Sequence, residues 1–532
     1  MKALSAPREA TAPPVGTAPP VGTAPPVGTA PPVGTAAARP AYRPLVLVAG
    51  AVAVLLAATS SRVGAFGDEL YFVAAGRHPD WGYVDQPPLV PLLARLLWDV
   101  SGGSLVVLRL PATLLTALAV VAAGLIAYEM GGSRRAQVLT AAVAGVSSGL
   151  LATGHVLATS TVDPVLWILV TWLLVRWLRL RDDRLLLAAG LLTALAVQVK
   201  FLIGGFWLVL IVAVLVAGPR EMLRRPLLLL GGVVTVVSLA PGLVWQARHG
   251  WPQLEMASVI AAEQQQTAGG RAAFLPLTVV MAGIAAGAVL AGLGLWRLLR
   301  GPYHFLGLTV VGVLALFLIG GGRQTYASGL LPVCWAAGAV RLDAYPARLD
   351  GRPASRAWRW LTHPLSLALT LVVTVLAALP VRPVAQQVQV DYVARGSTGW
   401  PRLADTVARA YADLPAGQRS RVSLVADTFW QASALEVYGP ARGLPRPYSP
   451  NRGYGYFGEP PERARNTLYV GVDPGALRSA FTDVRQVAKM SNPDGFVEQN
   501  GVVPVWWCTG RTVSWARLWP GLRHADTAPL TW

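Results

Sequence analysis

Cysteine is scarce in this sequence: 532 residues contain two, Cys334 inside an apolar run and Cys508 near the carboxyl terminus. Their wide separation and different surroundings argue against a disulfide framework and against a cysteine-based metal cluster. Charge is scarce as well, because 14% of the residues are charged and 54% are hydrophobic. Soluble proteins carry about 25% charged residues. The composition therefore excludes a string of soluble domains and indicates an integral membrane protein.

Acidic residues are fewer than basic ones, 27 against 45, so the formal net charge is +18. Such an excess could indicate a nucleic-acid partner, but nucleic-acid binding needs the basic residues collected on one soluble face. Here they lie between apolar runs. We therefore expect no nucleic acid as a partner and attribute the charge to membrane topology.

The amino-terminal residues 1–43 contain no pattern of a cleavable signal peptide and repeat TAPPVG four times from Thr11 to Gly34. Proline-rich repeats of this kind cannot bury a core and favour extended conformations. We predict a disordered, Pro-rich cytoplasmic tail over 1–43.

Apolar runs of membrane-spanning length, about 17–25 residues each, recur from Pro44 onward. They predict about eleven transmembrane helices, of which the fifth and tenth runs are short. The expected spans are 44–61, 105–128, 136–154, 162–178, 185–199, 202–218, 227–245, 273–296, 304–320, 327–341 and 364–381. We assign residues 44–384 to this transmembrane domain.

Arginine is concentrated in alternate loops between these runs. Cytoplasmic loops of membrane proteins carry an excess of Lys and Arg. With the amino terminus in the cytoplasm, the arginine-rich loops are those that contain Arg134 and Arg135, Arg176 to Arg184, Arg220 to Arg225, Arg297 and Arg300, and Arg341 to Arg359. The multi-pass chain should therefore lie in the cell membrane with the stretch after the first span, and everything after residue 382, on the extracytoplasmic side.

With this topology, the unusual polar residues of the apolar part all fall at the extracytoplasmic face. Each residue also has a simpler interpretation. The acidic pair could be a solvated loop, Asp163 before Pro164 could cap a helix, and Lys200 could extend from a helix end to the interface. Tyr71, Trp81 and Tyr83 could belong to an aromatic belt. The residues concerned are Asp68, Glu69, Tyr83, Asp85, Asp163, Lys200, Arg323 and Tyr326.

The order of these motifs along the chain resembles the C-type membrane glycosyltransferases, in particular bacterial glycosyltransferase family 39, kin of the protein O-mannosyltransferases and of the lipid A aminoarabinose transferases. The motifs are DELYFVAAG followed by GYVDQPPL, then STVDPVLW, AVQVKFLIG, VWQARHGWPQLE and GRQTYASGLLP. They span residues 44 to about 345. The resemblance implies a GT-C-like polytopic α-helical fold and an inverting glycosyltransferase that moves a sugar from a polyprenyl-phosphate carrier to an acceptor at the extracytoplasmic face.

The resemblance also implies roles for the residues. The acidic pair of the first outer loop is the catalytic signature of these enzymes and corresponds to Asp68 and Glu69. A carboxylate must accept the proton of the acceptor hydroxyl, and Asp68 is our candidate. Fixed cations must stabilise the leaving phosphate, and Lys200 and Arg323 are the candidates. We expect the remaining members of the set, Tyr83, Asp85, Asp163 and Tyr326, to bind the substrates.

The resemblance leaves a metal cofactor open and implies the partners of the reaction. Some relatives use a divalent metal and others do not, so a metal stays open although carboxylates are suitable ligands for a hard ion. His78 and His155 lack partners at ligand spacing and are better explained as interfacial polar residues. The expected partners are the polyprenyl-phosphate-linked sugar donor, membrane lipid, and an acceptor glycan, lipid or protein.

Residues 385–532 predict an extracytoplasmic soluble α/β domain. The segment WPRLADTVARAYADL has helical spacing, PGALRSAF predicts a helix, and RVSLVA, NTLYVGV and VVPVWWCTG predict strands. The Gly-, Pro- and aromatic-rich stretch 443–461 is too long for an ordinary connection, and such loops often bind a ligand. It could equally be a surface loop that covers the edge of the sheet.

A polytopic transporter or lipid flippase is the alternative function. Transporters commonly show inverted repeats and broken helices at the membrane midplane, and the sequence shows neither pattern. Polar residues at one membrane face favour chemistry on a lipid-linked substrate instead. A catalytically inactive scaffold that presents the soluble domain is a third interpretation, and the intact acidic pair argues against it.

Overall fold

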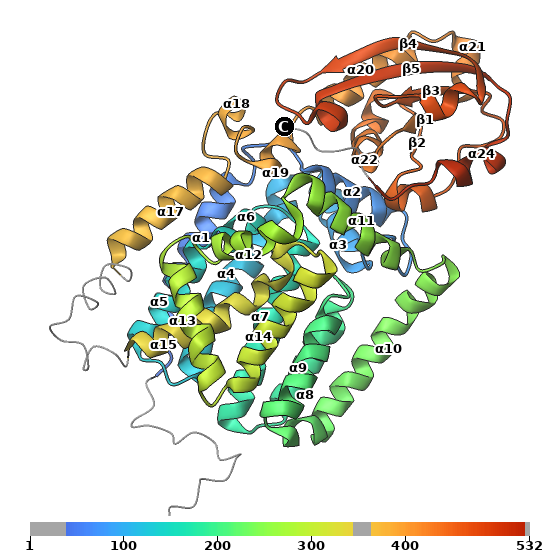
Figure 1. Cartoon of the computed structure of the whole chain (residues 1–532). Coiled ribbons are helices and arrows are strands. Elements are labelled where there is room, and N and C mark those ends of the chain that lie inside the picture. The colour runs from blue at the N-terminus through green and yellow to red at the C-terminus, as the bar shows by residue number, and fades with distance from the viewer. Residues whose placement is uncertain (1–38, 344–362, 527–532) are drawn as a thin grey trace, which may run out of the picture.

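A computed structural model describes residues 39–343 and 363–526. The chain folds into a helical bundle with a smaller α/β part at one end (Figure 1). We call residues 400–526 the C-terminal unit. The predicted tail 1–43 lies almost entirely outside the described residues.

Most helices of the bundle begin and end close to the predicted apolar runs. The helices are α1 (Tyr42–Thr59), α2 (Gly67–Arg77), α3 (Leu89–Val100), α4 (Leu105–Glu129), α5 (Arg134–Val146), α6 (Ser148–Gly154), α7 (Thr159–Leu180), α8 (Arg184–Ala196), α9 (Ile203–Ala217), α10 (Pro226–Arg248), α11 (Pro252–Thr267), α12 (Gly270–Met281), α13 (Ala286–Arg300), α14 (His304–Gly320), α15 (Leu331–Asp343) and α17 (Pro364–Ala378). Of these, α2, α3 and α11 lie in segments that were predicted as loops. The share of each long apolar helix that is buried in the bundle differs widely, from little of α10 to most of α7.

Four of the described helices, α1, α4, α7 and α10, are each long and apolar enough to cross a membrane alone. Two bent pairs raise this number to six if each pair is one span. The remaining apolar helices are shorter, so the predicted number of eleven spans stays a prediction. The large exposed apolar surface of α10, which includes Leu229, Val233 and Val237, is what a lipid-facing helix requires.

Two of the predicted spans, 136–154 and 273–296, are each divided between two helices. Helices α5 and α6 meet at an angle of 53°, and α12 and α13 at 105°. The two breaks lie against each other, since the Ser148 hydroxyl donates to the Val280 carbonyl oxygen (2.8 Å). Small residues around Gly283 permit this close approach. No pattern in the sequence predicted these two bends.

The C-terminal unit is built on a five-stranded mixed sheet in the order β2-β1-β3-β5-β4. Strands β1 (Val422–Ala426), β3 (Asn466–Val470) and β5 (Val502–Arg511) lie where the sequence predicted strands. Strand β4 (Phe481–Ser491) was missed, because most of its side chains are exposed and no apolar alternation marks it. The short strand β2 (Pro447–Tyr448) belongs to the stretch 443–461.

Helices α20 (Trp400–Ala412), α22 (Phe429–Tyr438), α23 (Gly475–Arg478) and α24 (Trp515–Leu522) accompany the sheet. Helix α20 confirms the helix predicted from WPRLADTVARAYADL. Helix α22 was not predicted; Thr428 caps its amino terminus by accepting a hydrogen bond from the Gln431 amide.

Helix α22 of the C-terminal unit packs against α2 of the bundle (Figure 1). Gly67 lies so close to Trp430 that a Cβ atom would approach its indole ring to 2.3 Å. The rings of Tyr71 and Phe429 make an edge contact at 4.9 Å between centroids. One continuous apolar core therefore extends from the bundle into the C-terminal unit.

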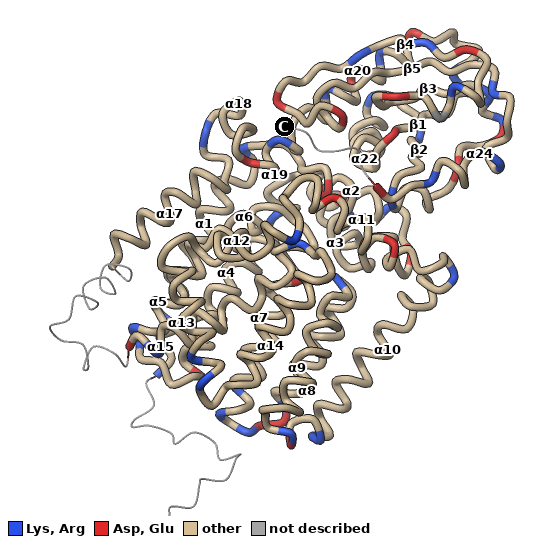
Figure 2. The backbone as a smooth tube through the Cα atoms, viewed as in Figure 1, with Lys and Arg blue, Asp and Glu red and all other residues tan. Residues whose placement is uncertain are grey.

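Many basic residues lie at the end of the bundle opposite the C-terminal unit, around the lower ends of α8, α9 and α15 in the view of Figure 2. The acidic residues Asp68, Asp85 and Glu263 belong to elements at the other end. Acidic residues also occur at the first end, where Glu221 and Asp183 pair with Arg181 and Arg225.

Candidate active site

Asp68 lies in the first turn of α2, directly under the C-terminal unit. Its Oδ1 accepts a hydrogen bond from Trp430 Nε1 (2.8 Å). Burial raises the pKa of Asp68, while the Trp430 hydrogen bond and the positive charges of Arg452 and Arg323 act in the opposite direction. A carboxylate with a raised pKa holds a proton more tightly than an ordinary aspartate, which suits a group that must accept one.

Glu69 has a different environment from its neighbour. Its side chain is fully buried and pairs with Arg109, with an Oε2 to Nη2 distance of 2.6 Å. Its two oxygens also accept from the backbone amides of Phe66 (2.9 Å) and Leu157 (3.0 Å) and from Arg109 Nε (2.9 Å). These four hydrogen bonds occupy the lone pairs of both oxygens. These contacts suit a residue that stabilises the fold, and the catalytic role that the resemblance implied for Glu69 stays a prediction.

Asp85 belongs to the same polar region as Asp68. Its Oδ1 accepts from the Tyr71 hydroxyl (2.9 Å). Burial raises the pKa of Asp85 to about 6, although the charge of Arg452 and the Tyr71 hydrogen bond lower it. The buried Asp85 carboxyl therefore holds a proton more tightly than an exposed aspartate does.

A bridge of three charged residues connects the bundle with the C-terminal unit. Glu263 of α11 accepts from Arg323 Nη2 (3.2 Å) and from Arg452 Nη2. Arg323 precedes the 3-10 turn η2 (Gln324–Leu330), and its buried Nε has no hydrogen-bond partner among the described residues. A buried N–H without a hydrogen-bond partner costs folding free energy. This N–H is therefore suited to donate a hydrogen bond to an oxygen of a ligand.

Sequence reasoning missed Glu263, Arg452 and Trp430. Arg452 begins the 3-10 turn η5 (Arg452–Tyr456) within the stretch 443–461, whose unusual length and composition were the available signal. Glu263 and Trp430 carried no comparable signal, because each is one polar or aromatic residue in an ordinary helix.

A second cluster contains Asp163, Lys200 and Tyr326. Lys200 lies between α8 and α9, and its Nζ is 4.3 Å from the centroid of the Tyr326 ring. Asp163 is buried, interacts electrostatically with Lys200, and accepts from Trp167 Nε1 (3.0 Å). Helix α7 begins at Thr159, so Asp163 lies inside it and does not cap it. Tyr326 also interacts electrostatically with Arg323, which connects this cluster to the first.

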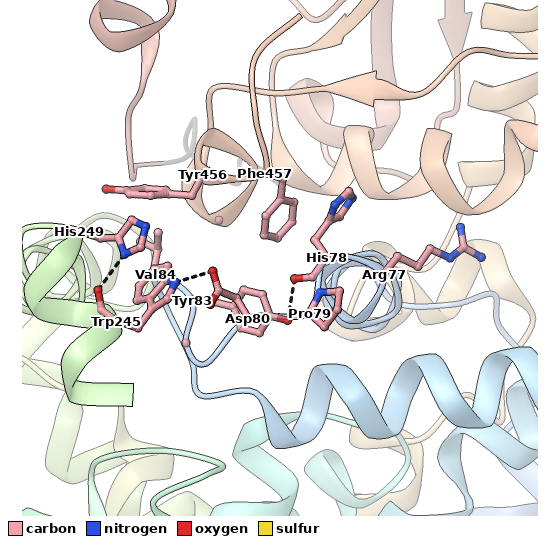
Figure 3. Close-up of a pocket in the computed structure, with 12 residues that line it drawn as sticks. Arg77, His78, Pro79, Asp80, Tyr83, Val84, Trp245, His249, Tyr456 and Phe457 are labelled. Atoms are coloured by element: carbon pink, nitrogen blue, oxygen red, sulfur yellow. Dashed lines mark hydrogen bonds between the residues drawn. The ribbon is translucent and has the colours of Figure 1, made fainter. Parts of the chain in front are cut away.

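Tyr83 is buried and donates a hydrogen bond to the Ala75 carbonyl oxygen (2.9 Å). It lines a pocket of about 370 Å³ between the first loop of the bundle, the end of α10 and η5 (Figure 3). The exposed Trp81 does not line this pocket. The other residues of the pocket wall are Arg77, His78, Pro79, Asp80, Gly82, Val84, Trp245, His249, Gly453, Tyr456 and Phe457.

A metal does not fit the described arrangement. Among the described residues, no three His, Cys, Asp or Glu side chains are grouped as a metal site requires. Glu69 pairs with Arg109, and Asp163 interacts with Lys200, so neither carboxylate is grouped with Asp68 and Asp85 as a metal ligand. We therefore derive no step through a metal ion.

The structure thus brings the predicted residues into two neighbouring clusters. Asp68, Asp85 and Arg323 form the first with Arg452 and Glu263. The second consists of Asp163, Lys200 and Tyr326. Tyr83 lies in the adjoining pocket. Glu69 belongs neither to the two clusters nor to the pocket, because it pairs with Arg109.

Residues 85–245 match the family described as dolichyl-phosphate-mannose-protein mannosyltransferase. The matched segment contains Asp85, Asp163 and Lys200, covers less than a third of the chain, and begins after Asp68. No curated protein matches the chain significantly in sequence.

The whole fold is similar to that of ArnT from Cupriavidus metallidurans. The apo structure superposes with a TM-score of 0.56 at 16% identity and covers 86% of this chain and 97% of ArnT. The structure of ArnT bound to undecaprenyl phosphate gives a TM-score of 0.56 at 18% identity, with the same coverage. The family match and this fold confirm the resemblance to the C-type membrane glycosyltransferases.

Proposed function

We propose that this protein is an inverting glycosyltransferase that moves a sugar from a polyprenyl-phosphate carrier to an acceptor hydroxyl at the extracytoplasmic membrane face. The observation that carries the proposal is the position of Asp68. This carboxylate interacts with the positive charges of Arg452 and Arg323 and bonds to Trp430 of α22, where α2 meets the C-terminal unit.

Asp68 is the general base of the proposed reaction. It accepts the proton of the acceptor hydroxyl as the hydroxyl oxygen attacks the anomeric carbon from the side opposite the phosphate. The new glycosidic bond forms, the bond from the anomeric carbon to the phosphate oxygen breaks, and both electrons of that bond remain on the polyprenyl phosphate. Attack from the opposite side inverts the anomeric centre.

Arg323 and Lys200 are the proposed partners of the phosphate. Negative charge develops on the leaving phosphate, and fixed cations stabilise it most where water is excluded. The unpaired Nε of Arg323 supplies a donor that the described residues do not use. Glu263 accepts from Nη2 of the same guanidinium and thereby restricts its orientation.

The carrier and the acceptor follow from the same chemistry. The similarity of the fold to an ArnT structure that contains undecaprenyl phosphate supports a polyprenyl carrier. Tyr83, Asp85, Asp163 and Tyr326 line or adjoin the two clusters and orient the sugar and the acceptor. The acceptor is a glycan, a lipid or a protein with a free hydroxyl.

The broken helices do not favour a transporter here. In transporters, such breaks expose polar backbone or charged groups to a substrate at the membrane midplane. The residues at these breaks, Ser147 and the stretch 282–285, carry no charge, and the two breaks pack against each other. The charged clusters lie elsewhere, which supports the transferase.

Substitution of Lys200 tests the phosphate site. We expect Lys200→Met to weaken binding of undecaprenyl phosphate roughly 10- to 100-fold, because a charge-assisted hydrogen bond contributes about 1.5–3 kcal/mol. Lys200→Arg should retain part of the affinity through its guanidinium. Binding is measured with the full chain in detergent. Lys489→Met, which removes an exposed lysine of β4, is the matched control. Equal affinity of Lys200→Met and the control would remove Lys200 from the site.

The proposed topology predicts which engineered cysteines an impermeant reagent reaches in intact cells. A cysteine at Gly443, in the C-terminal unit, should be labelled from outside, and one at Gly22, in the segment before the described residues, should not. The native Cys334 and Cys508 are buried, so they contribute little background. The reverse labelling pattern would contradict the extracytoplasmic location of the site.

A further inference from the structure

We propose that the pocket between the bundle and η5 binds a sugar ring of the acceptor, which makes the acceptor a glycan or a glycolipid. This inference rests on the proposed function. The volume of about 370 Å³ lies near the lower end of the usual range for ligand pockets, roughly 300–1,000 Å³. A pocket of this size suits a small ring system and not a folded partner.

Aromatic rings form two opposite walls of the pocket (Figure 3). On one side His78 stacks on Phe457, with ring centroids 4.6 Å apart and an angle of 18° between the planes. On the other side His249 stacks on Trp245 at 4.1 Å and 23°. Tyr456 lies near this second pair, 5.9 Å from the His249 ring.

Aromatic faces carry partial negative charge and attract the slightly positive C–H groups of a sugar ring. The polar atoms of the pocket complete this recognition. Asp80 Oδ2 accepts from Trp245 Nε1 (2.7 Å), which fixes the carboxylate and the indole relative to each other. His249 Nδ1 donates to the Trp245 carbonyl oxygen (2.8 Å), so neutral His249 presents Nε2 as an acceptor. Acceptors between aromatic faces are what a ring with several hydroxyl groups requires.

Gly453 connects the pocket with the proposed reaction centre. It lines the pocket, and a Cβ atom at this position would lie 1.9 Å from the Tyr71 hydroxyl. That hydroxyl donates a hydrogen bond to Asp85, and the charge of Asp85 interacts with that of Asp68. A sugar in the pocket is therefore held next to the carboxylates that would activate one of its hydroxyls.

The C-terminal unit supplies an essential part of this pocket. Gly453, Tyr456 and Phe457 come from η5 and the residue after it, while His78 and Trp245 come from the bundle. The contacts of the unit with α2 hold the two parts together. The stretch 443–461 thus acts as an acceptor-binding loop and does more than cover the sheet edge.

Saturation-transfer NMR with the full chain tests this inference. The probes are the methyl glycosides of mannose, glucose, galactose and arabinose, and the detergent is sugar-free lauryldimethylamine oxide. We expect at least one glycoside to receive saturation on its ring protons. Tyr456→Ala should weaken this binding roughly 2- to 10-fold, because an aromatic contact contributes about 0.5–1.5 kcal/mol.

Tyr448→Ala is the matched control, because Tyr448 lies in the same loop, is also partly buried, and does not line the pocket. Three results would overturn the inference: no glycoside binds, Tyr456→Ala binds as well as the control, or a threonine-containing peptide binds in place of the sugars. Undecaprenyl phosphate binding is measured on the same samples. If the protein binds a glycoside but does not bind undecaprenyl phosphate, the proposed function is rejected and the sugar pocket remains supported.

Discussion

Asp68→Asn is expected to lower sugar transfer roughly 10²-fold or more while the protein stays folded, because an amide keeps the size of the side chain but cannot accept the proton. Transfer is measured with the purified full chain and a polyprenyl-phosphate sugar. Asp99→Asn is the matched control: Asp99 is an exposed carboxylate of α3 that pairs with Arg95 and lies outside both clusters. Near-normal transfer by Asp68→Asn would assign the base to Asp85 or Asp163.

The same residue determines an expected pH dependence. A base works only when it is ionised, and burial raises the pKa of Asp68 above the usual value for aspartate, about 3.9. Transfer by the wild type should therefore fall as the pH decreases through this raised pKa. The residual transfer of Asp68→Asn should lack this acid limb. An identical acid limb in the variant would show that another group controls it.

Glu69→Gln is expected to have the opposite phenotype, a large loss of stability. Removing one partner of a buried ion pair costs about 3–5 kcal/mol, because the remaining charge is buried without compensation. Here the remaining charge is Arg109, which is fully buried. Arg109 also donates to the carbonyl oxygens of Ser60 and Gly64, so the connection between α1 and α2 should loosen as well.

Thermal unfolding in detergent, followed by size-exclusion chromatography, measures this effect. Glu221→Gln is the control, because Glu221 forms an exposed ion pair with Arg181 and such pairs contribute little. We expect the control to unfold like the wild type. If Glu69→Gln were equally stable but inactive, Glu69 would have the catalytic role that the resemblance implied.

The contrast between Asp68 and Glu69 shows why the site could be predicted only in part. Successive residues of a helix point about 100° apart, since 3.6 residues make one turn. The sequence placed both acids in the loop after the first span, whereas they lie in the first turn of α2, and it could not tell which one faced the C-terminal unit. That depended on Arg109 and Trp430, which are 40 and 362 residues away from their partners.

The sequence by itself determined the membrane character, the positions of the apolar helices and the selection of most polar candidates. These features depend on run length, composition and order, which are local properties of the chain. It also predicted three strands of the C-terminal unit, because their apolar residues lie next to one another.

Only the tertiary structure decided the bends between α5 and α6 and between α12 and α13, the ion bridge from Arg323 through Glu263 to Arg452, and the pocket beneath η5. Small residues permit a bend, but the helices packed around them determine whether it forms. An ion pair or a pocket wall requires side chains from distant segments to meet at fixed distances. That meeting is a property of the packed chain and leaves no trace in the neighbouring sequence.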